Sequence, residues 1–261
     1  MLDLGLLDLA VPLIVLIITI VYLPITFVVL LGKLKLSQLT SRHAFRQAWF
    51  ERFWVFFGSA SKPLFAKDVE ATLAEARGIV LDVGTGSGDW LYLFAPPRNK
   101  HISMLILLEP NLNFHGVLRM RAEKLGLAGR YEIIDGGIKD LERIGIQTGT
   151  IDTITTVHVL CSVEAPQALI EKLYAYLKPG GQWLVYEHIK IRNEKSLAAH
   201  WQDTINIVWP TFLDGCSLTR NTEDFLLQAG EWKSEDLRPG SREGRFNQLP
   251  HTVGRLVKRG S

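Results

Sequence analysis

The sequence predicts an α/β fold with a doubly wound parallel sheet, and three observations support this class. Five short apolar runs alternate with stretches of helical spacing; the runs are residues 79–83, 102–110, 131–136, 151–160 and 182–189. Glycines follow the first run directly, as they do where a parallel strand turns into a ligand site. Near the end, a short helix at 222–228 precedes residues 232–240 and 251–260, which we expect to form an antiparallel pair at the sheet edge.

A long apolar segment precedes the predicted sheet. From Leu9 to Leu31 the chain has 23 residues without a charge, about 34 Å as a helix, which is long enough to cross a bilayer. Pro24 is expected to interrupt this helix, which leaves a single span and a monotopic insertion both open. Acidic residues precede the segment and basic residues follow it, so we expect it to be retained, with the domain on the cytosolic side; they are Asp3, Asp8, Lys33, Lys35, Arg42, Arg46 and Arg52.

The next stretch, residues 41–57, is rich in aromatic and basic side chains. Phe45, Trp49 and Phe53 recur every four residues, which predicts an amphipathic helix. Such a helix either lies in the headgroup layer of a membrane or packs on the domain and covers its pocket.

Composition excludes several classes of function. The chain has 261 residues, and 29 basic against 27 acidic side chains leave a net charge of +2. Because these charges are interspersed, we expect no nucleic-acid partner. The two cysteines, Cys161 and Cys216, lack a CxxC pair and a nearby HxxxH, so the sequence predicts neither a disulfide framework nor a metal site.

The glycine turn is the first candidate for a ligand site. Gly84, Gly86 and Gly88 form G-x-G-x-G, whereas a dinucleotide fold places its third glycine where this chain has Asp89. No P-loop motif occurs in the sequence. We expect the bare backbone to admit a ligand to amide groups at the start of a helix. The carboxylate of Asp82 before the turn suits a ligand that carries an ammonium and a sulfonium.

A second acidic residue follows the second apolar run. Glu109 lies 21 residues after Gly88, where a carboxylate can accept hydrogen bonds from both hydroxyls of a ribose. In order, "LDVGTGSG", "LLEPN", "IDTI" and "LKPGG" resemble the class I S-adenosylmethionine-dependent methyltransferases over about residues 75–190. The resemblance implies a Rossmann-like fold and S-adenosyl-L-methionine as cofactor.

A narrower resemblance covers nearly the whole chain. "HVLCSVE" at 158–164, "YEHI" at 186–189 and "FLDGCSLTR" at 212–220 are similar to the methyltransferase-like 7 family, membrane-associated enzymes of endoplasmic reticulum and lipid droplets that methylate alkyl thiols. This resemblance implies that the turn glycines approach the methionine part of the cofactor, Glu109 its ribose, and Gly136 with Gly137 its adenine. An aspartate is common in the class at the place of Gly136. The cofactor-binding set that we predict is Asp82, Gly84, Thr85, Gly86, Gly88, Glu109, Pro110, Asn111, Gly136, Gly137 and His158.

Methyl transfer depends mostly on positioning and water exclusion, because the leaving group is already activated. A thiol acceptor needs modest help to ionise, and an alcohol or phenol needs a base more urgently. We expect Asp214 and His188 to be the catalytic side chains, with His158 next; Cys216 and Glu187 are further candidates near the strand ends.

Three regions follow from these observations. Residues 1–35 form the membrane anchor, 36–70 the aromatic connecting helix and 71–261 the methyltransferase domain. An insertion at about 190–220 either covers the reactive end of the cofactor or packs on the sheet; its large apolar residues at helical spacing are Trp201, Ile205, Val208 and Trp209.

The sequence thus predicts a membrane-anchored methyltransferase that acts on a small lipophilic acceptor, an alkyl thiol first. O-methylation of a hydroxyl or carboxyl in a lipid or secondary metabolite stays open. A nicotinamide-dependent oxidoreductase is disfavoured by the glycine spacing and by the lack of a Tyr-x-x-x-Lys pair. A non-catalytic membrane scaffold is the third hypothesis. We expect an endoplasmic reticulum or lipid droplet location, with the catalytic domain facing the cytosol.

Overall fold

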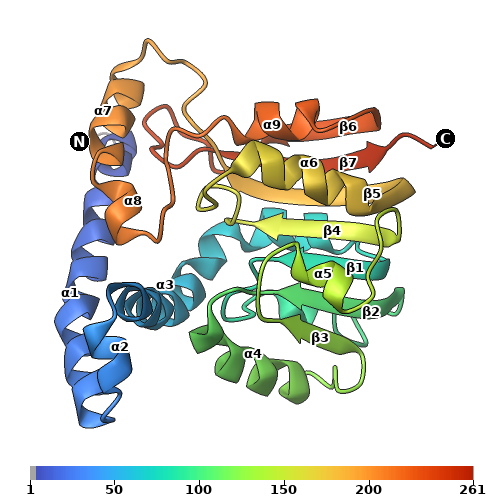
Figure 1. Ribbon diagram of the computed structural model, residues 1–261. Coiled ribbons are helices and arrows are strands. Elements are labelled where there is room, and N and C mark those ends of the chain that lie inside the picture. The colour runs from blue at the N-terminus through green and yellow to red at the C-terminus, as the bar shows by residue number, and fades with distance from the viewer. Residues whose placement is uncertain (1–3, 261) are drawn as a thin grey trace.

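The computed structural model describes residues 4–260 and arranges seven strands of this range in one sheet, in the order β3-β2-β1-β4-β5-β7-β6 (Figure 1). The first five strands are parallel, and β7 runs antiparallel between β5 and β6. The strands are β1 Gly78–Val83, β2 Ile102–Leu108, β3 Tyr131–Ile134, β4 Ile151–Val157, β5 Leu177–His188, β6 Trp232–Pro239 and β7 His251–Lys258. The predicted class and the antiparallel edge are confirmed.

Helices cover both faces of this sheet, which explains why its strands read as apolar runs. In β1, Leu81 and Val83 face α5 (Asp140–Arg143), α6 (Pro166–Tyr176) and α9 (Thr222–Gln228). Val80 points the other way, toward α4 (Leu112–Lys124) and the end of α3 (Arg42–Leu73). The predicted helix at 222–228 is confirmed, whereas "LKPGG" belongs to β5 instead of preceding it.

The glycine turn is not followed by an α-helix, so that expectation was wrong. After the turn, the chain makes only a single 3-10 turn, η2, at Leu91–Leu93. Pro96 and Pro97 follow this turn after two intervening residues; because neither can donate a backbone hydrogen bond and each restricts the residue before it, a longer helix is disfavoured here. The N–H donors that we expected at the start of a helix must therefore come from the backbone of the turn itself.

The apolar N-terminal segment forms η1 (Leu4–Leu9) and α1 (Val11–Gly32). The expected interruption at Pro24 was wrong, because α1 continues through it. The loss of one N–H donor is tolerated within a long helix whose other residues keep their hydrogen bonds. The hydroxyls of Thr19 and Thr26 each donate to the carbonyl four residues before, at 2.8 and 2.7 Å, so both threonine hydroxyls are paired within the helix.

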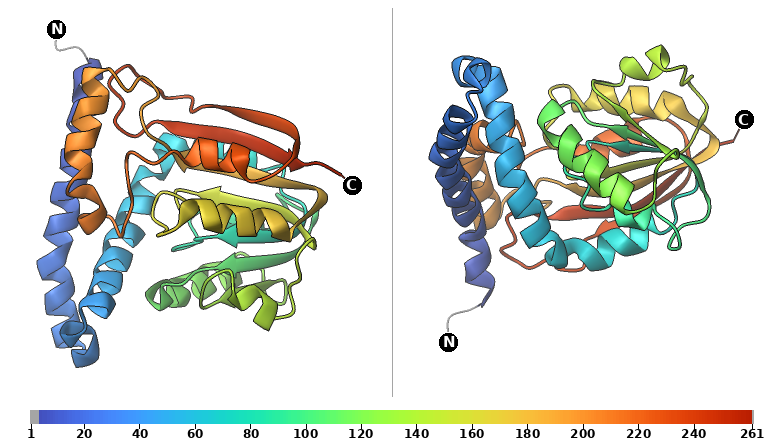
Figure 2. Two further views of the ribbon diagram at one scale, coloured as in Figure 1. Left: turned by 45° about the horizontal axis from the view of Figure 1, so that its top comes forward. Right: turned by 90° about the horizontal axis from the view of Figure 1, so that it is seen from below.

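A layer of helices lies beyond the carboxyl ends of the parallel strands (Figures 1 and 2). One face of α1 packs on α3, on α7 (Leu197–Asn206) and on α8 (Trp209–Phe212), while α2 (Leu36–Thr40) connects α1 to α3. Two tryptophans join the layer to the backbone of the N-terminal segment: Trp49 Nε1 donates to the Thr19 carbonyl of α1 at 2.8 Å, and Trp201 Nε1 donates to the Leu9 carbonyl of η1 at 2.9 Å. The apolar core of this layer contains Val15, Leu16, Phe53, Ile205, Trp209, Leu213 and Leu218.

Of the two positions considered for the aromatic helix, the structure shows packing on the domain. α3 begins at the predicted place, where the Ser41 hydroxyl accepts from the Ala44 N–H, and it runs to Leu73. It changes direction partway (Figure 2), and Pro63 lies inside it. Its first half stands between α1 and the sheet, and its second half packs on the sheet with Val69 and Leu73.

Candidate active site

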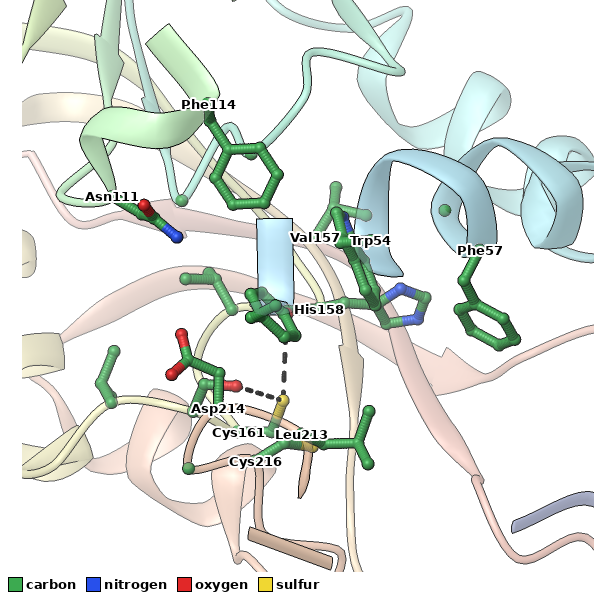
Figure 3. A pocket seen from close by; sticks show the side chains of 18 of the residues that line it. Trp54, Phe57, Asn111, Phe114, Val157, His158, Cys161, Leu213, Asp214 and Cys216 are labelled. Atoms are coloured by element: carbon green, nitrogen blue, oxygen red, sulfur yellow. Dashed lines mark hydrogen bonds between the residues drawn. The ribbon is translucent and has the colours of Figure 1, made fainter. Parts of the chain in front are cut away.

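A cavity of about 1760 Å³ lies between the strand ends and the helical layer (Figure 3). Its floor comes from the carboxyl ends of β1, β2, β4 and β5. Its walls come from α1, α3 and α8 and are largely apolar; they include Val15, Leu23, Trp49, Phe50, Trp54, Phe57, Trp209 and Leu213. The cavity therefore joins a polar floor, at the switch point of the sheet, to an apolar roof.

The glycine turn needs glycine for conformation and for space. Gly84 has a φ of +66°, and a Cβ there would lie 2.2 Å from a methyl carbon of Val159. Gly86 has a φ of +57°, and a Cβ there would contact the Trp54 ring at 3.5 Å. At Gly88, which has a φ of +77°, a Cβ would instead collide with the side chains of Leu118 and Leu91. The first two glycines thus face the site, and the third lets the turn pack on the core.

Glu109 ties the turn to the end of β2. Its Oε2 accepts from the Gly86 N–H at 2.7 Å, and its Oε1 accepts from the Asn111 N–H at 2.8 Å. Each oxygen keeps room for a second donor. Burial raises the pKa of Glu109 to about 7, the two backbone donors lower it, and the nearby carboxylates of Asp214 and Asp82 raise it.

Asp82 lies on the same floor, at the end of β1. The Thr155 hydroxyl donates to its Oδ1 at 2.6 Å. Burial raises the pKa of Asp82 to about 6, although the hydrogen bonds from Thr155 and Thr85 oppose the shift. Two carboxylates with raised pKa values in one cleft are a typical mark of a functional site.

Asp89, the residue at which this turn departs from the dinucleotide pattern, holds the turn to its surroundings. It accepts from Ser59 at 2.7 Å, from Ser87 at 2.5 Å and from the Arg121 guanidinium at 2.6 Å. Lys62 of α3 donates to the Asp89 carbonyl at 2.7 Å. The carboxylate thus fixes α3 and α4 on the turn.

Asp214, His158 and His188 also line the cavity, and Asp214 lies near enough to Glu109 to raise its pKa. Asp214 has a φ of +49° and forms an ion pair with Arg46 of α3 at 3.2 Å. Burial raises the pKa of Asp214, and Arg46 lowers it. His158, also at positive φ (+57°), places its Nε2 3.0 Å from Nε2 of His251. Burial and the neighbouring imidazole lower the pKa of His158 well below its ordinary range.

Almost all of the residues predicted for the site line this cavity. They are Asp82, Gly84, Thr85, Gly86, Gly88, Glu109, Pro110, Asn111, Gly137, His158, His188 and Asp214. Gly136 does not line it: a Cβ at Gly136 would meet the Asp140 carboxylate at 2.0 Å, which places this residue against α5. Glu187 is fully buried and accepts from the Val159 and Leu160 N–H groups, so it holds the loop after β4.

Sequence reasoning missed the side chains that form the roof. Trp54 and Phe50 of α3 stack on each other with ring centroids 5.6 Å apart, and Phe114 of α4 meets Phe50 edge-on at 6.2 Å. Figure 3 shows Trp54 and Phe57 on one side of the cavity and Asn111 with Phe114 on another. The four-residue aromatic period was the available signal; it predicted an amphipathic helix that lies on a membrane or covers the pocket, without assigning single side chains to the cavity.

Comparison with known proteins agrees with this geometry. Residues 59–224 match the family model described as a methyltransferase domain. The chain belongs to this family. It is 29% identical over 257 residues to Thiol S-methyltransferase TMT1B of Rattus norvegicus, a match that covers 96% of this chain and 100% of the relative.

Solved methyltransferases share the fold. The S-adenosylmethionine-dependent methyltransferase SibL in its apo form superposes with a TM-score of 0.58 at 19% identity, covering 80% of this chain and 58% of the other. An O-methyltransferase family protein of Burkholderia thailandensis also gives 0.58, at 18% identity, over 86% of this chain and 62% of the other. The protein is an S-adenosylmethionine-dependent methyltransferase of class I fold.

The residues present suit this cofactor. A buried carboxylate with spare acceptor capacity stands at the end of β2, which is what a ribose diol requires. Gly84 and Gly86 line the cavity, and the Asp82 carboxylate lies beside the turn, where it suits an ammonium.

Proposed function

We propose that this protein is a membrane-attached enzyme that methylates small lipophilic thiols. The observation that supports this most is the shape of the cavity: one continuous space joins the glycine turn to an apolar roof contributed by α1, α3 and α8. The relative from Rattus norvegicus, which matches over its whole length, is named a thiol S-methyltransferase.

We propose that Gly84 and Gly86 bind the methionine part of the cofactor, that Asp82 pairs with its ammonium and that Glu109 accepts from its ribose. Thr85, Pro110, Asn111 and Gly137 complete this part of the site, and Gly88 supports the turn from behind. The bound cofactor supplies a methyl group on a sulfonium. The chain contributes position and water exclusion, which the aromatic roof supports.

We propose that the acceptor lies under the aromatic roof of the cavity and beside Asp214. We propose that Asp214 takes the proton that the thiol loses, and that His158 and His188 border the acceptor and orient it. Arg46 keeps the Asp214 carboxylate in the cavity, at 3.2 Å. A thiol suits this set because its reference pKa of about 8.5 makes proton loss easy.

Membrane attachment is supported by α1. Residues Leu7–Gly32 form a helix long and apolar enough to cross a membrane, with 22% of its most apolar window buried. Its outward face is exposed and entirely apolar over Leu13, Ile14, Ile17, Ile20, Val21, Phe27, Val28 and Leu31. Insertion of this face into one leaflet of a membrane would remove its apolar side chains from water.

The packing of α1 favours a helix that lies along the membrane surface over one that spans it. Its inner face contacts the rest of the protein from Leu9, bound by Trp201, to Leu30, which is buried. A span would carry the packed part of α3, with Arg46 and Arg52, into the hydrocarbon core, which is costly. We propose a cytosol-facing attachment to endoplasmic reticulum or lipid droplet membranes, supported by the basic residues that follow α1.

The test uses the full-length protein in detergent. We expect calorimetric titration to show binding of S-adenosylhomocysteine and not of NADH. With labelled donor, we expect label transfer to alkyl thiols in preference to phenols, alcohols and carboxylic acids of equal chain length. Transfer to hydroxyl or carboxyl acceptors alone would replace the thiol assignment, and binding of neither nucleotide would reduce the protein to a scaffold.

A further inference from the structure

Three soft or borderline metal-ligand side chains meet at the acceptor end of the cavity. Cys161 lies in the loop after β4, His188 ends β5, and Cys216 lies in the loop after α8. One ligand atom from each lies within 4.8 Å of the other two. The chain has two cysteines, and both are in this cluster. Figure 3 shows the two sulfurs near each other, below His158 and beside Asp214 and Leu213.

The distances are close to those of a tetrahedral metal site. With Zn–S bonds of about 2.3 Å and Zn–N bonds of about 2.0 Å, a tetrahedron separates two sulfurs by roughly 3.8 Å and a sulfur from a nitrogen by roughly 3.5 Å. Cys216 Sγ lies 3.8 Å from His188 Nδ1. No pair of ligand atoms in the cluster exceeds 4.8 Å, so an inward movement of about an ångström or less closes the site.

Both sulfurs have polar neighbours, and the Cys161 thiol donates to the His158 carbonyl oxygen at 3.8 Å. Trp209 Nε1 donates to Cys216 Sγ at 3.3 Å, and Ser162 Oγ lies 3.6 Å from Cys161 Sγ. Such outer-shell donors stabilise and orient thiolate ligands. His188 is only 4% exposed, and its Nε2 has no hydrogen-bond partner within residues 4–260. Nδ1 is the ring nitrogen that faces Cys216 Sγ, so it is the one available to a metal.

We propose that Cys161, Cys216 and His188 bind one thiophilic divalent cation, Zn²⁺ in the cell. Two thiolates and one imidazole neutralise the ion and leave its fourth position open. All three residues line the cavity, so the open position faces its interior. A disulfide would use only the two sulfurs, whereas a metal uses the two sulfurs and His188 Nδ1, which faces Cys216 Sγ at 3.8 Å.

The sequence could not reveal this site, because its ligands come from three distant segments and no two are spaced as in a zinc finger. If the proposed function holds, the open position lies where the acceptor sulfur binds, and a thiolate could complete the tetrahedron. This last step rests on the proposed function; metal binding does not.

The test is a Co²⁺ titration of the full-length protein in detergent, after chelation and under reducing conditions with a phosphine. We expect one equivalent of Co²⁺ to produce a thiolate-to-cobalt charge-transfer band and tetrahedral ligand-field bands, and Zn²⁺ to abolish both. Because Cys161 and Cys216 are the chain's two thiols, a charge-transfer band reports on this cluster.

Variants locate the binding. We expect Cys216→Ser to weaken the charge-transfer band and His188→Gln to lower Co²⁺ affinity by at least about tenfold. His101→Gln, at an exposed histidine, is the matched control and should bind Co²⁺ like the parent. Titration with S-adenosylhomocysteine verifies that each variant is folded.

Three results would overturn the metal site: no charge-transfer band in the parent, unchanged affinity in both variants, or thiol counting that finds Cys161 and Cys216 joined as a disulfide after purification. A parent that binds Co²⁺ in this way but transfers no methyl to thiols would refute the proposed function and leave the metal site standing.

Discussion

Burial and the proposed ribose contact place opposite demands on the Glu109 carboxyl: burial favours the protonated form, and the ribose contact favours the ionised form. Burial raises the pKa of this carboxyl from 4.5 to about 7 in the folded protein. Between these values the unfolded chain has released the proton and the folded chain still holds it, so ionisation costs stability progressively and in full above about pH 7. A ribose diol needs the ionised carboxylate as acceptor. In the site that we propose, the protein therefore keeps a destabilising charge where the cofactor can use it.

This conflict predicts a pH-dependent cofactor affinity. From pH 8 to pH 6.5 the ionised fraction of a carboxyl with a pKa of about 7 falls about fourfold, so we expect affinity for S-adenosylhomocysteine to fall by about that factor. Calorimetric titration at both values measures it. This range stays above the pKa of Asp82, about 6.

Glu109→Gln is the control for this effect. It keeps the size of the side chain and cannot ionise, so we expect weaker binding that no longer changes over this interval. An equal pH dependence in Glu109→Gln would assign the effect to another group.

Single residues also show how far sequence reasoning reaches. Glu109 was predictable, because a parallel strand carries its last residue to a known edge of the sheet. Arg46 as the partner of Asp214 was not, since this ion pair depends on how α3 crosses the cavity. Gly136 was misplaced relative to the cavity for a similar reason: its neighbours are set by α5.

At the scale of elements, α1 carries two different surfaces. Its composition predicted one apolar helix and could not separate a lipid face from a packing face, because both are apolar. Contacts with α3, α7 and α8 define the inner face. The outward face, with Ile17 61% and Val28 65% exposed, is the one that we propose to contact the membrane.

Charges on the outward face should release the protein from membranes. We expect Ile17→Asp and Val28→Asp each to lower partitioning onto vesicles of neutral phospholipid by more than about tenfold, since each removes about 2 kcal/mol of apolar burial and adds a charge. Met120→Asp, at a 60% exposed position on α4, is the matched control.

Flotation of the full-length proteins measures this partitioning, and circular dichroism checks that they fold alike. Parent-like flotation of both α1 variants would show that α1 is not the membrane contact.

At the scale of the whole molecule, the donor and acceptor ends belong to different layers. The sheet and its turns hold the residues assigned to the cofactor, and the helical layer forms the roof over the acceptor. The sequence predicted the first layer well because strands of a parallel sheet follow a regular order. It predicted the second poorly, because α1, α3, α7 and α8 meet through side chains far apart in the chain.

Replacement of Phe53 by alanine tests whether the helical layer and the sheet unfold together. Phe53 is 0% exposed at the centre of the helical layer and does not line the cavity. We expect Phe53→Ala to cost about 3–5 kcal/mol through the space it leaves. For a chain of this size that lowers the unfolding temperature by roughly 6–20 °C. Phe56→Ala, at a 52% exposed neighbour on the same helix, should shift it far less.

Scanning calorimetry of the full-length protein distinguishes one cooperative unit from two. Because α3 continues from the helical layer onto the sheet, with Phe53 in the first and Val69 in the second, we expect a single transition that moves as a whole in Phe53→Ala. Below that transition, S-adenosylhomocysteine should bind to the variant as it does to the parent, since the turn and Glu109 are untouched. An early transition that melts the helical layer while cofactor binding persists would show instead that the roof folds independently, and that the acceptor space opens and closes by local unfolding of α1 and α3.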